Sequence, residues 1–148
     1  MSEVDFATWI IALTMILLEA LSDIKKREIK MSYLIIGAVI GVIILFLPNG
    51  EIEPLDSLLG ILLGISVMVM AFLTGGGIGY GDGLLLCVTG LLLGVRANII
   101  LLFAGCFFSS LVSMFLLVIK KADRKTSLPF IPFLIPSLCV VYFFERII

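Results

Sequence analysis

The sequence predicts an all-α membrane protein, a polytopic bundle of about six transmembrane helices. Three observations predict this fold class. The 148 residues are 61% apolar and only 14% charged, with a mean hydropathy of +1.29, whereas a soluble domain is about half apolar and a quarter charged. The apolar residues gather in six stretches, and the connections between them differ sharply in charge. Since a span takes about 20 residues, this length allows about six crossings and no separate soluble domain.

Each hydrophobic stretch is expected to form one helix. The stretches cover residues 6–21, 31–47, 57–73, 84–95, 97–119 and 129–144. Acids rather than bases precede the first stretch, which disfavours a cleaved signal peptide. The fourth stretch is the shortest, and its helix rises only ~18 Å against a hydrocarbon core of ~30 Å. We still expect it to cross, because the glycine-rich segment before it then already lies inside the bilayer.

The charge of the connections predicts which ends face the cytoplasm. The connections at 22–30 and 120–128 are rich in lysine and arginine, whereas residues 48–56 hold three acids and no base. Connections rich in lysine and arginine stay in the cytoplasm. Six spans with the N-terminus outside therefore place both basic connections inside, in a multi-pass protein of the cytoplasmic or inner cell membrane. The basic residues of the first connection are also expected to bind anionic lipid headgroups.

A glycine-rich segment points to a cavity in the membrane. Residues 75–83 contain six glycines and Asp82. Such a segment makes a poor helix, and irregular backbone at membrane depth survives only where it is buried in protein or lines a wet cavity. One expected span precedes Asp23 and three precede Asp82, so both aspartates reach the cytoplasmic face. This shared face is the central structural inference from the sequence.

Two carboxylates at one site suit general acid–base hydrolysis of a peptide bond. Neighbouring like charges cannot easily both ionise, so such a pair shares a proton. The charged member takes a proton from water while the neutral member protonates the substrate. The chain has no histidine and no closely spaced cysteines, which excludes histidine-based catalysis and leaves metal and redox sites with weak support. We expect no metal and no cofactor, and the net charge of −1 gives no basic field for a nucleic-acid partner.

Other interpretations of these acids remain open. Asp82 precedes an apolar helix and is a candidate N-cap residue, and Asp23 is a candidate partner for Arg27 on the same helix face. Glu19 lies one helical turn before Asp23 and either tunes that aspartate or extends to the membrane interface. A functional alternative from another class is a small transporter or channel in which Asp23 and Asp82 bind a cation.

Three features together resemble the type IV prepilin peptidase family. Gly79-Tyr80-Gly81-Asp82 resembles the G-x-G-D motif of aspartic intramembrane proteases. Asp23, at the end of the first stretch and before a short basic connection, resembles the other aspartate of prepilin peptidases. The stretch Leu128-Pro129-Phe130-Ile131-Pro132-Phe133-Leu134 resembles the proline–phenylalanine stretch that precedes the last span of that family.

The resemblance implies an aspartic endopeptidase that cleaves the basic leader from prepilin or pseudopilin substrates at the cytoplasmic face. Asp23 and Asp82 would be the catalytic pair, and Gly79 and Gly81 would shape the site. The larger family members carry a cytosolic domain with paired cysteines and also methylate their product. This chain resembles the short form, so residues 1–148 are expected to be one peptidase domain without methyltransferase activity. An inactive assembly relative is the remaining alternative, and the oligomeric state is left undetermined.

The same resemblance extends the site to two prolines, and helix geometry adds the acid in the first span. Pro129 and Pro132 are expected to break the backbone near the entrance of the site. Glu19 is included among the residues expected to shape it, because it shares a helix face with Asp23.

Overall fold

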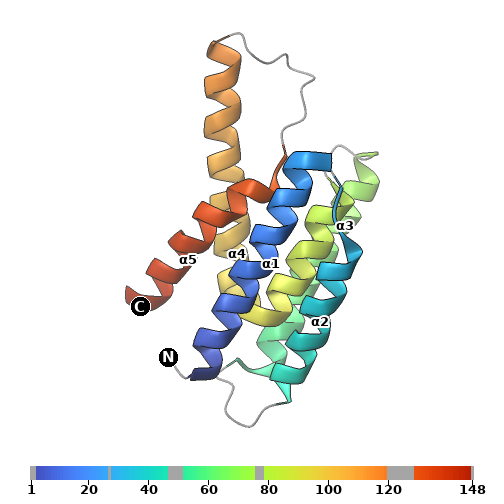
Figure 1. Ribbon diagram of the computed structural model, residues 1–148, viewed down its shortest axis with the longest axis vertical. Coiled ribbons are helices and arrows are strands. Elements are labelled where there is room, and N and C mark those ends of the chain that lie inside the picture. Colours follow the sequence, from blue (N-terminus) through green and yellow to red (C-terminus); the bar gives the residue numbers. More distant parts are fainter. Residues whose placement is uncertain (1–2, 27, 47–51, 76–78, 120–128, 148) are drawn as a thin grey trace.

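The computed structural model describes residues 3–26, 28–46, 52–75, 79–119 and 129–147, and every regular element in these ranges is a helix (Figure 1). The elements are α1 (Glu3–Lys26), α2 (Met31–Leu45), α3 (Pro54–Leu73), α4 (Tyr80–Val118), the short 3-10 helix η1 (Ile131–Phe133) and α5 (Leu134–Ile147). The predicted all-α class is confirmed for this part of the chain. The basic connection at 120–128 lies outside the described residues, as does Arg27.

Three of the described helices are long and apolar enough to cross a membrane. These are α1 over residues 6–25, α3 and α4, while α2 and residues 131–145 form shorter apolar helices. Such helices bury too little of their apolar surface in the protein to be stable in water, and lipid is the solvent that suits them. The chain is therefore a membrane protein. The number of crossings and the outside position of the N-terminus stay predictions.

Helix α4 consists of two segments that fold back on each other at Gly94. Gly94 has φ 80° and ψ 174°, which is not helical. The Asn98 side-chain amide donates a hydrogen bond of 2.8 Å to the Leu86 carbonyl, although twelve residues of straight helix would separate the two by ~18 Å. We call the segments α4a (residues 80–93) and α4b (residues 95–118). They correspond to the fourth and fifth hydrophobic stretches, joined without a loop.

Glycine is required at the turn between α4a and α4b. A positive φ of this kind is disfavoured for every residue with a Cβ atom. In addition, a Cβ atom at position 94 would overlap the carboxylate of Asp56 in the first turn of α3. The turn is therefore possible only because residue 94 has no side chain.

Helices α3 and α4a pack with their backbones in contact. A Cβ atom on Gly60 would lie only 2.5 Å from the Gly90 carbonyl oxygen, and one on Gly64 would overlap the backbone of Cys87. Small residues allow this close approach between helices in a membrane. The buried Asn98 amide joins the pair to α4b, because it donates to the Gly60 carbonyl (3.2 Å) and accepts from the Thr89 hydroxyl (2.8 Å).

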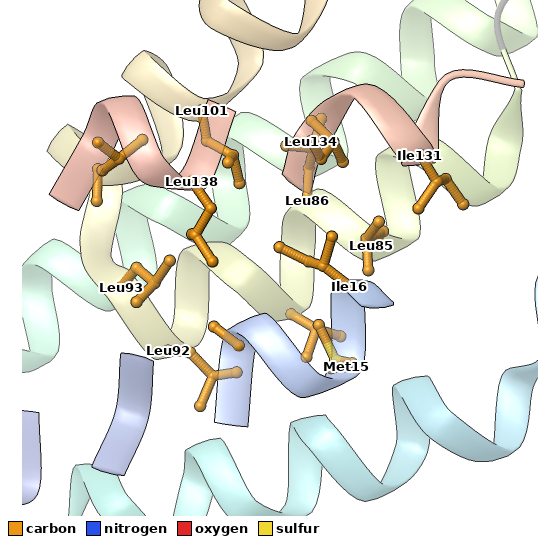
Figure 2. Packing of buried hydrophobic residues seen from close by; sticks show 14 of the residues in the cluster. Met15, Ile16, Leu85, Leu86, Leu92, Leu93, Leu101, Ile131, Leu134 and Leu138 are labelled. Atoms are coloured by element: carbon orange, nitrogen blue, oxygen red, sulfur yellow. The ribbon is translucent and has the colours of Figure 1, made fainter. Parts of the chain in front are cut away.

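The apolar core joins α1 to α4, η1 and α5. Figure 2 shows side chains from these four elements converging, and they include the completely buried Ile16, Leu85, Leu86, Ile131 and Leu134. Segments that lie far apart in the sequence are thereby held at one end of the bundle. This packing fixes the end of α1 relative to the beginnings of α4 and α5.

Candidate active site

The two predicted aspartates lie at the same end of the bundle. Asp23 is in the last turn of α1 and Asp82 is in the first turn of α4, and both side chains are half-buried. In Figure 1 the end of α1, the beginning of α4 and η1 lie near one another, below the part of α4 that extends past the other helices. The negative charge of Asp23 acts on Asp82. The fold thus brings together two carboxyl groups that are 59 positions apart in the sequence.

Asp82 is held by the turn that starts α4. Gly79, in an extended conformation (φ −68°, ψ 125°), is the N-cap residue, and Asp82 is the third residue of the helix. The Asp82 carboxylate accepts a hydrogen bond from the Gly79 backbone, and the Asp82 N–H donates to the Gly79 carbonyl at 3.1 Å. The N-cap interpretation of Asp82 is therefore wrong, although its carboxylate does bond back to the N-cap residue in the manner of a capping box.

The two glycines of the G-x-G-D motif are needed for close approach. A Cβ atom on Gly79 would lie 2.7 Å from Oδ2 of Asp82, and one on Gly81 would overlap the Ile29 side chain. Gly79 thereby leaves room for the carboxylate, and Gly81 leaves room for the connection between α1 and α2. Both glycines therefore leave space at the G-x-G-D motif, and their role in shaping a site stays a prediction.

Asp23 is held by the proline-containing stretch before α5. The backbone N–H of Ile131 donates a hydrogen bond of 3.3 Å to Oδ2 of Asp23. Ile131 begins η1, in which Pro132 occupies the first turn and the Phe133 N–H donates to the Phe130 carbonyl at 3.0 Å. Since proline cannot donate a backbone hydrogen bond, it favours this irregular turn over a regular helix. Pro129 lies just before the turn and is half-buried.

Glu19 points into the protein and binds the backbone of the next connection. Its side chain is completely buried, and its Oε2 accepts a hydrogen bond of 3.0 Å from the Lys30 N–H. Its Oε1 is buried and has no hydrogen-bond partner among the described residues. The interpretation in which Glu19 extends to the membrane interface is therefore wrong. The charge of Asp23 acts on Glu19, so the three acids form one electrostatic group.

The carboxyl pair lies level with the middle of α4b rather than with its end. Asp82 and Cys106 each lie twelve positions from Gly94, on opposite segments of the hairpin, and the charge of Asp82 acts on the Cys106 thiol. Twelve further residues, to Val118, carry α4b ~18 Å beyond this level. The upper part of α4b accordingly extends past the other helices in Figure 1.

Among the described residues, sequence reasoning missed two groups that lie at the site but belong to neither α1 nor α4. The first is the backbone N–H of Ile131. Nearly every residue has such a group, so the sequence cannot indicate which one binds Asp23. The second is Ile29, whose side chain covers Gly81. The sequence did carry a sign of this contact. Ile29 is an apolar residue among charged ones, and an apolar side chain in such a connection indicates that part of the connection is buried. Among the described residues, no group of three or more histidines, cysteines or acids is arranged to hold a metal ion.

Comparison with known proteins identifies one family. The model of the type IV leader peptidase family matches residues 9–120. The matched region includes Asp23 and the G-x-G-D motif with Asp82, and it ends before Pro129. Searches of curated proteins and of solved structures gave no significant match.

Proposed function

Because this chain belongs to the type IV leader peptidase family, we propose that it is an aspartic endopeptidase with Asp23 and Asp82 as its catalytic residues. One observation carries the proposal. Two acids that lie 59 positions apart within the matched region are at one end of the bundle, within electrostatic reach of each other, and each accepts a hydrogen bond from a backbone N–H. Buried acids in a membrane protein are costly and mark functional sites.

The pair catalyses hydrolysis by sharing one proton. The ionised carboxylate removes a proton from water while the oxygen of that water attacks the peptide carbonyl, and the protonated carboxyl donates its proton to the carbonyl oxygen. When the tetrahedral intermediate collapses, the C–N bond breaks and the leaving amine takes a proton from the pair. Because interacting acids titrate together, the shared proton belongs to the pair rather than to a fixed member.

The substrates are proposed to be prepilin-like or pseudopilin-like proteins, with a basic leader followed by an apolar helix. The leader stays at the cytoplasmic face, as the charge of the connections predicts. Since α4b extends ~18 Å past the level of the pair, the scissile bond must enter the bilayer to reach the carboxyl groups.

The test is cleavage of a co-expressed prepilin by wild type, Asp23→Asn and Asp82→Asn. Asparagine keeps the size of aspartate but cannot exchange the proton, so each single variant is expected to lose cleavage while staying folded. Asp56→Asn is the matched control, because Asp56 also occupies the first turn of a helix but contacts Gly94 at the turn of the α4 hairpin. Full cleavage by either site variant rejects the catalytic pair. A transporter would instead show ion flux that both site variants abolish.

A further inference from the structure

We infer that Glu19 is a positioning residue, which fastens the connection between α1 and α2 so that Ile29 is held against Gly81 beside Asp82. This inference rests on the proposed function, because it assigns a role in the reaction of Asp23 and Asp82. This positioning role differs from a direct electrostatic effect of Glu19 on Asp23. The chain of contacts runs from a carboxylate through the backbone of residue 30 to a side chain that covers the G-x-G-D motif.

The first step is the cost of burying Glu19. Its side chain is completely buried, yet only Oε2 has a hydrogen-bond partner among the described residues. A buried carboxyl with an unpartnered oxygen destabilises the fold, and an apolar side chain of similar volume would be less costly. Stability alone therefore does not account for an acid at this position. What the acid adds, and an apolar residue cannot, is an acceptor for the Lys30 N–H.

The second step is the effect of that hydrogen bond on the chain direction. Lys30 is the N-cap residue of α2, in an extended conformation (φ −85°, ψ 103°), and its side chain makes no capping bond. Its carbonyl accepts the Tyr33 N–H at 3.0 Å inside the new helix. An N–H group at the start of a helix has no acceptor within that helix. The Lys30 N–H donates to Glu19 instead, at 3.0 Å. The bond ties the beginning of α2 to Glu19, which lies about two turns before the end of α1.

The third step leads from Lys30 to the catalytic motif. Ile29, the preceding residue, is half-buried and packs against the core. Its side chain fills the space directly over Gly81, where a Cβ atom would overlap it. Asp82 is the next residue, so a shift of residue 29 changes the packing around the catalytic carboxyl. A displacement of about 1 Å in a catalytic group costs about a hundredfold in rate.

The experiment compares Glu19→Gln, Glu19→Ala, Ile29→Ala and the double variant Glu19→Ala/Ile29→Ala in prepilin cleavage. Glutamine keeps an oxygen that accepts the Lys30 N–H, so Glu19→Gln is expected to retain kcat within about threefold. Glu19→Ala and Ile29→Ala are each expected to lower kcat about ten- to a hundredfold, with KM within about threefold of wild type. Because both changes release the same contact, the double variant is expected to lose no more than the worse single variant.

Matched controls separate this role from general damage. Glu28→Ala removes an exposed acid from the same connection, and Met31→Ala removes an exposed apolar side chain two residues beyond Ile29. Both controls are expected to keep wild-type kcat. Helical content and thermal unfolding are recorded for every variant, so that a loss of kcat is read only from protein that is folded at the assay temperature.

Each contradictory outcome has its own meaning. Wild-type kcat in folded Glu19→Ala overturns the inference. A loss of kcat in Glu19→Gln as large as that in Glu19→Ala also overturns it, because it would show that the ionisable proton of Glu19 matters rather than its hydrogen bond to Lys30. Additive losses in the double variant also overturn it. Asp23→Asn and Asp82→Asn are assayed alongside. Cleavage by either of these variants would reject the proposed function itself. If both are inactive while Glu19→Ala cleaves at the wild-type rate, only the role of Glu19 is rejected.

Discussion

The replacement Gly79→Ala tests whether the G-x-G-D motif places the Asp82 carboxylate with the precision that the reaction needs. The added Cβ atom would lie 2.7 Å from Oδ2 of Asp82, and an ordinary contact begins at 3.4 Å, so the carboxylate must move by about 0.7 Å. The backbone of residue 79 (φ −68°, ψ 125°) is accessible to alanine. The variant therefore misplaces the carboxylate without straining the chain.

The expected result is a loss of activity without a matching loss of stability. Since a displacement of about 1 Å costs about a hundredfold, we expect kcat for leader cleavage to fall about ten- to a hundredfold. Replacing glycine by alanine at the N-cap position changes the free energy of unfolding by only a few tenths to about 1 kcal/mol. The assay is the rate of prepilin cleavage in detergent or lipid, with the unfolding temperature measured on the same preparation.

Gly75→Ala is the control for this prediction. Residue 75 has nothing within 4 Å of an added Cβ atom, but its φ is +64°. We therefore expect the opposite pattern, a stability loss of about 1–2 kcal/mol with wild-type kcat in the folded fraction. Wild-type kcat in Gly79→Ala would refute the reasoning, because it would show that the carboxylate tolerates the displacement or does not take part in the reaction.

Two further predictions concern the hairpin of α4, far from the carboxyl pair. Asn98→Ala removes three side-chain hydrogen bonds; at about 0.6 kcal/mol each in a membrane protein, the variant should unfold about 2 kcal/mol more easily. An unchanged unfolding transition would show that the amide does not join the segments. Gly94→Ala should cost about 1–3 kcal/mol from its positive φ and more from overlap with Asp56. Adding Asp56→Ala should recover only the overlap, and complete recovery would contradict the strain.

The sequence was sufficient for the helical class and for the prediction that Asp23 and Asp82 lie at the same end of the bundle. Hydrophobic length and composition predict apolar helices, and the structure has one at each of the six stretches. For the fourth and fifth stretches, the sequence predicted only that one helix ends and the next begins near residue 96. That the helices join at Gly94 without a loop depends on a backbone angle and on Asp56 beside it, neither of which a composition reveals.

The parts that could not be predicted are contacts between distant positions. Ile131 holds Asp23 through its backbone, and a backbone N–H is common to nearly every residue. The partner of Glu19 is likewise the backbone of Lys30. Asn98 is different, because an amide within an apolar stretch is a visible signal of a buried polar contact. Its role as the link between α3, α4a and α4b was missed.

The most direct test of the central claim is chemical cross-linking of positions 23 and 82 in the membrane. The claim is that residues 23 and 82 face each other at one end of the bundle. Cys87, Cys106 and Cys139 are first replaced by alanine, and Asp23→Cys/Asp82→Cys is then treated with a short bifunctional thiol reagent. We predict an intramolecular cross-link in this pair and none in Asp23→Cys/Asp56→Cys. Failure of the first pair to react, with both thiols accessible to a monofunctional reagent, or equal cross-linking in the two pairs, would contradict the account.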